Sequence, residues 1–330
     1  MPAPIISPPF VEVLSNLQTE QRNKKSEHID EVSSLKLCQI INNEDATVAD
    51  AVQACLPEIA QAIDAIVPRI IAGGRVIYMG AGTSGRLGVL DASEIPPTFS
   101  APPSQFLSLI AGGDYAIRHA VEGAEDSQKA GEADVAMLEP PIGPNDVIIG
   151  LASSGRTPYV LGGLKFAREA GAATVGIACV KPSRLKGFCD ILIECVTGPE
   201  VVTGSTRLKA GTATKMILNM ISTGSQIRTG KTFGNLMVDL KMSNEKLRDR
   251  ARRVMRSAVP ETSAINIHDD DARIDQVLEL CQGKLKPAIL VVTLGCTPQQ
   301  AEDQLQASGG SLKVALRSEK ATEVSSSSEE

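Results

Sequence analysis

Short apolar runs alternate with longer segments of helical periodicity through the middle of the chain. The runs occupy residues 75–80, 106–112, 146–152, 173–180 and 190–196. They are continuous or rich in β-branched residues, which is typical of strands that are buried on both faces. The pattern predicts an α/β fold in which helices cover both faces of a parallel sheet, a three-layer αβα arrangement.

Helical patterns flank this region on both sides. One or two helices are expected over 47–74, with Thr47 as the N-cap and Gly73–Gly74 as the stop. The spacing of "SSLKLCQIINNED" before it also predicts a helix, as do the segment 207–228 and the charged "NEKLRDRARRVMRSAV". From Asp269 three short amphipathic pieces follow, and the run "AILVVTLG" fits a strand or a helix equally well by periodicity alone.

The composition divides the chain into four parts. Residues 1–45 form an N-terminal segment, Pro-rich at first and expected to be partly extended, and 46–240 form the α/β domain. Residues 241–318 form a small C-terminal helical region, and the polar, acidic tail 319–330 is expected to be disordered.

Composition and charge narrow the range of partners and locations. Aromatic residues are only 3% of the chain and Trp is absent, so the core must consist of Ala, Val, Ile and Leu. The net charge of −6 argues against nucleic acid as a partner, because phosphate backbones require a basic face. No signal peptide or membrane-spanning run is recognisable, which favours a cytoplasmic protein. The seven scattered cysteines indicate buried free thiols, and the three distant histidines indicate no metal site.

Two turns rich in glycine and hydroxyl side chains follow two of the expected strands. They are "MGAGTSGRLG", after "RVIYMG", and "GLASSGRTPY", after "DVIIG". Ligands of parallel α/β sheets bind beyond the carboxyl ends of the strands, where glycines let an anion approach the first amides of the next helix. We therefore expect one phosphate to be held from two sides. The candidate contacts are Gly82, Thr83, Ser84, Gly85, Ser153, Ser154, Gly155 and Thr157.

Neither turn matches a familiar nucleotide-binding motif. A P-loop needs a Lys directly before its Ser or Thr, and "GAGTSGRLG" has none. The fingerprint G-x-G-x-x-G occurs formally in "GAGTSG", but the acidic residue expected about 20 residues on is replaced by Asp114, about 30 residues on. A nicotinamide enzyme is therefore disfavoured.

Glu94 stands out among the acidic residues. It directly precedes Ile95 and the pair Pro96–Pro97, which is expected to end the helix that begins near Ser84. The negative end of a helix favours a protonated carboxyl, which suits a general acid. However, Ser84 and Glu94 are about 15 Å apart along a helix, too far for one hexose phosphate. Either the helix breaks early, for example at Gly88, or Glu94 serves the site of a neighbouring subunit.

Longer blocks of the sequence resemble one known family. The blocks are "GAGTSGRLGVLDASEIPPTF", "IAGGDYAIRHAVEGAED", "ASSGRTPYV", "GPEVVTGSTRLKAGTATK" and "NLMVD", with "TEQRN" and "ASGGSLKVAL" near the two ends. They are similar to the N-acetylmuramic acid 6-phosphate etherases, which belong to the sugar-isomerase (SIS) domain proteins. The resemblance extends over 19–316. It implies an SIS-type sheet, a small helical module over 269–316, and therefore a helix at "AILVVTLG".

The resemblance also implies a reaction and its residues. Members cleave the D-lactyl ether of N-acetylmuramate 6-phosphate to N-acetylglucosamine 6-phosphate and D-lactate, without a cofactor or metal. The two catalytic acids fall on Glu94, as proton donor, and Glu125 of "GAED", and the phosphate turns fall on Thr83–Ser84 and Ser153–Ser154. A homodimer with the site near the subunit boundary is implied, which would accommodate the distance to Glu94.

Two other functions stay open at this stage. A regulator of the glucokinase-regulatory-protein type shares these elements, but it resembles two SIS units in tandem and is much longer. An aldose–ketose sugar-phosphate isomerase would release no lactate. Roles for several further polar residues also stay open: a weak one in ring opening for Glu200, and contacts with phosphate or the lactyl carboxylate for Arg86, Arg156, Arg207, Lys209 and His119.

Overall fold

The computed structural model describes residues 17–239, 245–268 and 270–317. The expected extended start of the chain, up to residue 16, and the expected disordered tail lie outside these residues. The chain divides into two compact units. The first comprises the residues up to Ser93 and Ser104–Ser222, and the second comprises Glu94–Pro103 and the residues from Thr223 on.

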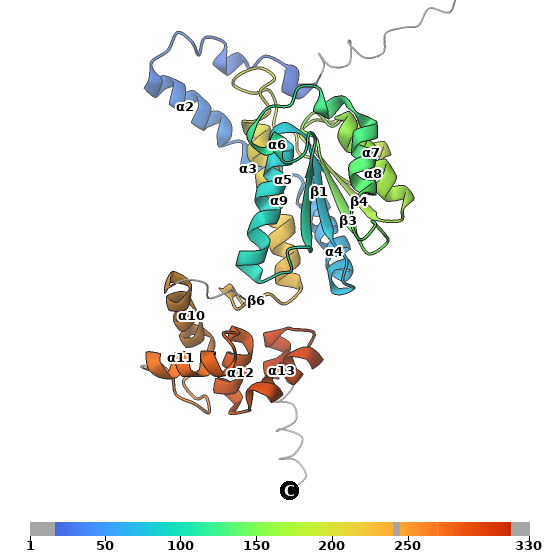
Figure 1. The fold of residues 1–330 in the computed structure, drawn as a ribbon. Helices are drawn as coiled ribbons and strands as arrows, with labels where there is room; N and C mark the ends of the chain where they lie inside the picture. The colour runs from blue at the N-terminus through green and yellow to red at the C-terminus, as the bar shows by residue number, and fades with distance from the viewer. Residues whose placement is uncertain (1–16, 240–244, 269, 318–330) are drawn as a thin grey trace, which may run out of the picture. The chain divides into compact units, whose positions relative to one another are not determined.

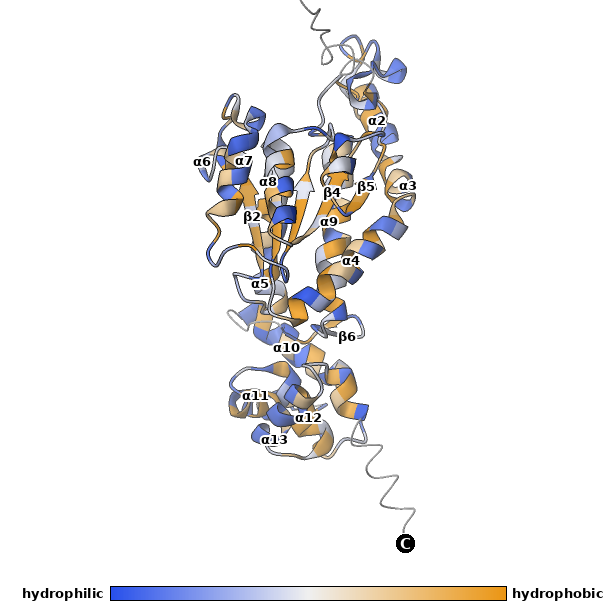
Figure 2. Cartoon of the chain, turned by 90° about the vertical axis from the view of Figure 1, so that its right-hand side faces the viewer, coloured by the Kyte–Doolittle hydropathy of each residue, from blue (hydrophilic) through white to orange (hydrophobic). Residues whose placement is uncertain are grey.

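A five-stranded parallel sheet forms the centre of the first unit (Figure 1). Its strands are β1 (Val76–Gly80), β2 (Phe106–Ile110), β3 (Val147–Leu151), β4 (Ala173–Ala178) and β5 (Ile191–Glu194). Their order in the sheet is β2-β1-β3-β4-β5. Each strand lies within one of the apolar runs, so the predicted α/β fold is confirmed. The strands are hydrophobic along most of their length, whereas the surrounding helices show both hydrophobic and hydrophilic sides (Figure 2).

Helices cover both faces of this sheet (Figure 1). The helices before and between the strands are α2 (Ser34–Asp45), α3 (Val48–Gln53), α4 (Leu56–Ile71), α5 (Gly82–Phe99), α6 (Tyr115–Arg118), α7 (Gln128–Ala136), α8 (Pro158–Glu169) and α9 (Lys209–Arg228). Short 3-10 turns are η1 (Gln18–Glu20), η2 (Lys24–Ser26), η3 (Ala124–Asp126) and η4 (Arg184–Gly187). The helices α7 and α8 pack on one face, whereas α5 and α9 lie on the face to which Tyr78 of β1 points.

The N-terminal helices follow the predicted pattern, with one difference at Thr47. Helix α2 occupies the segment predicted from its spacing, and Gly73, with a φ of +82°, follows the end of α4. Thr47 stands at the N-cap position of α3, but its side chain makes no capping bond. Its hydroxyl donates instead to the backbone carbonyl of Glu44, three residues earlier, at 2.7 Å.

Helix α5 runs without a break from Gly82 to Phe99. The expectation that Pro96–Pro97 end this helix is therefore wrong, and an early break at Gly88 is excluded. Each proline removes only the bond from its own nitrogen to the carbonyl four residues earlier, so a proline pair near the end of a long helix leaves the earlier turns intact. Gly88 serves close packing instead, because a Cβ there would lie 2.9 Å from the Cβ of Tyr78.

The second unit has its own hydrophobic core. Its elements are the short strands β6 (Thr232–Phe233) and β7 (Leu236–Met237) and the helices α10 (Glu245–Ala258), α11 (Asp271–Leu280), α12 (Leu285–Leu294) and α13 (Pro298–Ala307). Buried residues of all four helices pack in one cluster. Helix α12 includes the run from Ala288 to Leu294, so the helix implied there by the resemblance is confirmed.

Candidate functional site

The first Gly/Ser/Thr turn joins β1 directly to α5. The strand ends at Gly80 and the helix begins at Gly82, whose φ is +52°. A Cβ at Gly80 would lie 2.7 Å from the nitrogen of Gly85, and a Cβ at Gly85 would lie 2.6 Å from Cγ1 of Ile110. Glycines at these positions therefore let the first turn of α5 rest on the strand end, with the free amides of that turn at the edge of the sheet.

The second turn lies beside the first. Because β1 and β3 are neighbours, with Gly80 opposite Leu151, their carboxyl ends meet at one edge. Ser84, 9% exposed, has its Oγ 3.3 Å from the Oγ of Ser153. The structure thus brings together two of the hydroxyls that the sequence singles out, one from each turn. Such a pair, with the first amides of α5, can donate hydrogen bonds to one phosphate group.

Of the remaining residues of the second turn, Gly155 is buried, whereas Ser154 and Thr157 are partly exposed. Gly155 has a φ of +69°, and its carbonyl accepts a hydrogen bond from Ser183 Oγ at 3.1 Å. Thr157 is the N-cap residue of α8, and its hydroxyl makes no capping bond. Thr83 of the first turn has the same partial exposure as Ser154 and Thr157.

A pocket of about 190 Å³ adjoins the first turn. Its lining includes Gly82 and Arg86 of α5 and the loop from His119 to Glu125. Glu125 belongs to η3, directly after Gly123, whose φ is +71°. The structure therefore places one of the two expected catalytic acids, exposed to solvent, in the same pocket as a residue of the first turn.

The other expected acid, Glu94, is not among the residues that line this pocket. It is exposed on α5, ten residues beyond Ser84. Since the helix is unbroken, the separation of about 15 Å along its axis remains. The pocket of a single chain thus contains Glu125 without Glu94.

Two of the residues whose roles stay open from sequence make hydrogen bonds to the protein backbone. The guanidinium of Arg86 donates to three backbone carbonyls, those of Ala116, Ile117 and His119. Glu200, fully buried, accepts hydrogen bonds from the backbone nitrogens of Lys209 and Ala210 at the start of α9. Burial raises the pKa of the Glu200 carboxyl, although these donors oppose the shift. Its position is that of a helix cap.

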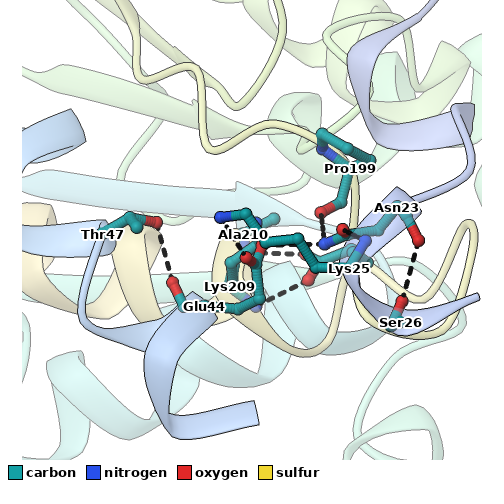
Figure 3. A network of polar contacts seen from close by, with 9 residues as sticks. Asn23, Lys25, Ser26, Glu44, Thr47, Pro199, Lys209 and Ala210 are labelled. Atoms are coloured by element: carbon teal, nitrogen blue, oxygen red, sulfur yellow. Dashed lines mark hydrogen bonds and ion pairs between the residues drawn. The ribbon is translucent and has the colours of Figure 1, made fainter. Parts of the chain in front are cut away.

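The structure also contains a buried ionic network that the sequence did not suggest (Figure 3). Glu44 accepts hydrogen bonds from Lys209 Nζ at 2.7 Å, Lys25 Nζ at 2.8 Å and Asn23 Nδ2 at 2.8 Å. Burial raises the pKa of Glu44, but these three donors outweigh it and lower the pKa to about 2. Two of the blocks that resemble the family contain members of this network, "TEQRN" with Asn23 and "GPEVVTGSTRLKAGTATK" with Lys209, but neither block indicates that the two segments meet.

Arg156 differs from the other arginines near the site. Its Nε is buried and has no hydrogen-bond partner among the described residues. Burial and the neighbouring charge of Arg184 both lower its pKa. Within the same described residues, no three His, Cys, Asp or Glu side chains gather into a possible metal site.

The remaining sequence-based expectations concern thiols and membranes. Five of the seven cysteines are buried thiols, as expected: Cys55, Cys179, Cys189, Cys195 and Cys281. Of the helices that the structure describes, none combines the length and the apolar character needed to cross a bilayer.

Comparison with protein-family models identifies the type of fold. Residues 117–223 match the model of the SIS domain. Residues 58–168 match the model of the glucokinase regulatory protein N-terminal SIS domain. Among solved structures, a phosphoheptose isomerase from Francisella tularensis aligns with a TM-score of 0.47 and 19% identity, covering 59% of this chain and 100% of that one. The SIS-type sheet that the resemblance implied is confirmed by the family model and the strand topology.

Curated relatives cover nearly the whole chain. The N-acetylmuramic acid 6-phosphate etherase of Rhodopirellula baltica is 49% identical over 292 residues, which are 88% of this chain and 93% of the relative. The enzyme of the same name from Pasteurella multocida is 47% identical, over 91% of this chain and 96% of its own length. On the strength of these identities and this coverage, the chain belongs to the family of N-acetylmuramic acid 6-phosphate etherases.

Proposed function

We propose that this protein cleaves the D-lactyl ether of N-acetylmuramate 6-phosphate and releases D-lactate and N-acetylglucosamine 6-phosphate. The identity to the etherases over about nine-tenths of the chain carries this proposal. The geometry supports it, because Glu125 lines a pocket together with Gly82 of the phosphate turn. The coverage favours the etherase over the tandem regulator, since the etherases are matched over 93% and 96% of their own sequences.

The phosphate is held where the two turns meet. Hydroxyls of Thr83, Ser84, Ser153, Ser154 and Thr157 and the first amides of α5 donate to it, with Gly82, Gly85 and Gly155 allowing the close approach. The Ser84–Ser153 contact of 3.3 Å supports this assignment. Binding at the phosphoryl end positions the carbons at the far end of the sugar without contacting them.

The chemistry follows from the position of the ether oxygen. Once the sugar ring opens, the aldehyde at C1 acidifies the proton on C2, and the lactyl oxygen on C3 lies β to that carbon. Glu125 removes the C2 proton, the C3–O bond breaks, and Glu94 gives a proton to the departing lactate oxygen. Water then adds across the unsaturated aldehyde, with its hydroxyl on C3 and its proton on C2. Each assisted proton transfer contributes about 10²- to 10⁴-fold in rate.

We further propose that Glu94 acts in the site of a partner subunit of a homodimer. Helix α5 is continuous, and Glu94 is absent from the residues that line the pocket of its own chain. Residues 46–240 would bind the sugar phosphate, with 241–318 as a helical appendage. We propose the cytoplasm as the protein's compartment.

Lactate release tests the function directly. The wild-type protein should release one D-lactate for each N-acetylmuramate 6-phosphate consumed. Glu125→Gln should lower this rate at least about 100-fold, since a carboxamide cannot accept the C2 proton. Asp126→Asn is the matched control, because Asp126 is the exposed neighbour of Glu125 and does not line the pocket. An isomerised sugar phosphate without lactate would contradict the etherase and establish an isomerase, and binding without turnover would establish a regulator.

A further inference from the structure

We infer that Arg86 is a positioning residue that ties the loop bearing Glu125 to the helix that begins at the phosphate turn. The inference rests on the proposed function for the role of Glu125. It assigns to Arg86 a task other than contact with the phosphate or the lactyl carboxylate.

The hydrogen bonds of Arg86 converge on one short helix. Its Nη2 donates to the carbonyls of Ala116, at 2.8 Å, and His119, at 3.2 Å, and its Nε donates to that of Ile117, at 2.9 Å. These carbonyls lie at the end of α6, where the last carbonyls of a helix have no partner within the helix. A planar guanidinium that bonds three of them fixes both the position and the orientation of the chain at that point.

The Arg86 guanidinium bonds backbone carbonyls. Among the residues that the structure describes, no carboxylate lies within ion-pair distance of its guanidinium. Backbone carbonyl oxygens carry a partial negative charge, so they are suitable partners for the guanidinium. Arg86 stands two residues beyond Ser84 on α5, and it therefore joins the rigid helix of the phosphate turn to the chain that follows α6.

The segment between α6 and η3 is exposed. It comprises residues 119–123, and Glu125 follows only six residues after His119. Within the loop, the backbone bond from Ala124 to Val121 is long, at 3.4 Å. The next attachments are Ala124, which is partly buried and packs against the hydrophobic cluster that includes residues of α8, and Ser127, whose side chain accepts a hydrogen bond from the nitrogen of Ala130 at the start of α7. The segment before Glu125 is thus held at Ala124 by packing and at the end of α6 by Arg86, and Arg86 is the attachment on the side of the phosphate turn.

Substitution of Arg86 should therefore impair turnover more than binding. Arg86→Lys keeps the charge but lacks the planar fork whose Nε and Nη2 reach the three carbonyls, and Arg86→Met removes both the charge and the donors. We expect both variants to lower kcat about 10- to 100-fold, the range for a catalytic group displaced by about 1 Å. The Kd for N-acetylglucosamine 6-phosphate should change less than about threefold, since the phosphate turn is intact. Arg118→Met, exposed on the same short helix, is the matched control and should keep wild-type kcat.

Hydrogen exchange separates a positioning role from a general loss of structure. In both Arg86 variants the amides of 119–126 should exchange faster, while those of α8 and of the β-strands keep their wild-type rates. If Arg86→Met does not fold, Arg86→Lys alone carries the test. A loss of phosphate-sugar binding with normal exchange at 119–126 would overturn the inference, and so would unchanged kcat in both variants. If the wild-type protein releases no lactate, the proposed function fails, whereas the exchange arm still decides whether Arg86 holds the loop.

Discussion

At the residue scale, the most unusual charges are those of Glu44 and Lys209. Their side chains are 6% and 3% exposed, and the carboxylate and ammonium are 2.7 Å apart. Two ions lose most of their hydration in such a place, so removing one of them leaves the other buried without a close opposite charge. The second lysine on Glu44, Lys25, is 72% exposed and contributes through water-screened attraction. The two lysines therefore offer a direct comparison of a buried and an exposed partner.

We predict that Lys209→Met lowers the free energy of unfolding by about 3–5 kcal/mol, because Glu44 is left buried without its main partner. Lys25→Met should lower it by about 0–1 kcal/mol, since that pair is exposed. Urea denaturation at neutral pH measures both values. Equal losses in the two variants would show that burial does not govern the strength of these pairs.

The same carboxyl predicts a pH dependence. Its pKa is about 2 in the folded protein, against an ordinary value of 4.5. A group whose pKa is lower in the folded state adds stability that is complete above pH 4.5 and is lost as the pH falls toward 2. The contribution is about 3 kcal/mol by the size of this difference. Unfolding measured between these pH values should be less pH-dependent in Glu44→Gln than in the wild type; identical slopes would contradict the assignment.

At the scale of elements, the contact between β1 and α5 depends on glycine. Both Gly80 and Gly85 lie where a Cβ would come closer than 3 Å to other atoms. The first turn of α5 therefore lies in close contact with the end of β1. This close contact sets the distance between Ser84 and Ser153. A change in that spacing should affect the binding of phosphate as well as the stability of the fold.

We predict that Gly85→Ala lowers the free energy of unfolding by about 1–3 kcal/mol, the usual effect of overpacking. It should also weaken the binding of N-acetylglucosamine 6-phosphate, because the first turn of α5 must move away from Ile110. Gly143→Ala is the control, since a Cβ there meets nothing within 4 Å. Denaturation and calorimetric titration measure the two effects. Normal binding in Gly85→Ala would separate the turn from phosphate recognition.

The elements also show what the sequence can and cannot predict. The five strands follow from their continuous apolar runs, and the nearness of the two turns follows from the rule for parallel strands. The order that makes β1 and β3 neighbours involves pairings between distant segments, which local pattern does not encode. The Glu44–Lys209 pair, 165 residues apart, escaped for the same reason. The prediction for the end of α5 is wrong because Pro96 and Pro97 stand in the last turn of a long helix, where each removes only the hydrogen bond of its own nitrogen.

At the scale of the whole molecule, the two acids lie in different compact units. Glu125 belongs to the first unit, and Glu94 to the short stretch 94–103 that clusters with the second. Assignment of Glu94 to a partner subunit makes the proposed active site a product of assembly. Such a site can be tested by coexpression, because two chains with different defects can together form one intact site.

We predict that Glu94→Gln and Glu125→Gln are each inactive alone but restore activity when coexpressed. In a mixed dimer, one site would combine Glu125 of one chain with Glu94 of the other, and the second site would lack both. Random pairing then gives about one quarter of the wild-type rate, since about half the dimers are mixed and each has one intact site. D-lactate release by the copurified mixture measures it. No recovery in a proven mixed dimer would place both acids in one chain.

The attachment made by Arg86 has a consequence for how the protein tolerates sequence change. All three acceptors are main-chain oxygens, which every amino acid supplies. Residues 116, 117 and 119 can therefore drift in identity, within the limits of space, and the tether persists. The arginine has no such latitude, because no other side chain provides the same fork of donors. A single side chain thus maintains the arrangement, whereas its three partners contribute only backbone oxygens.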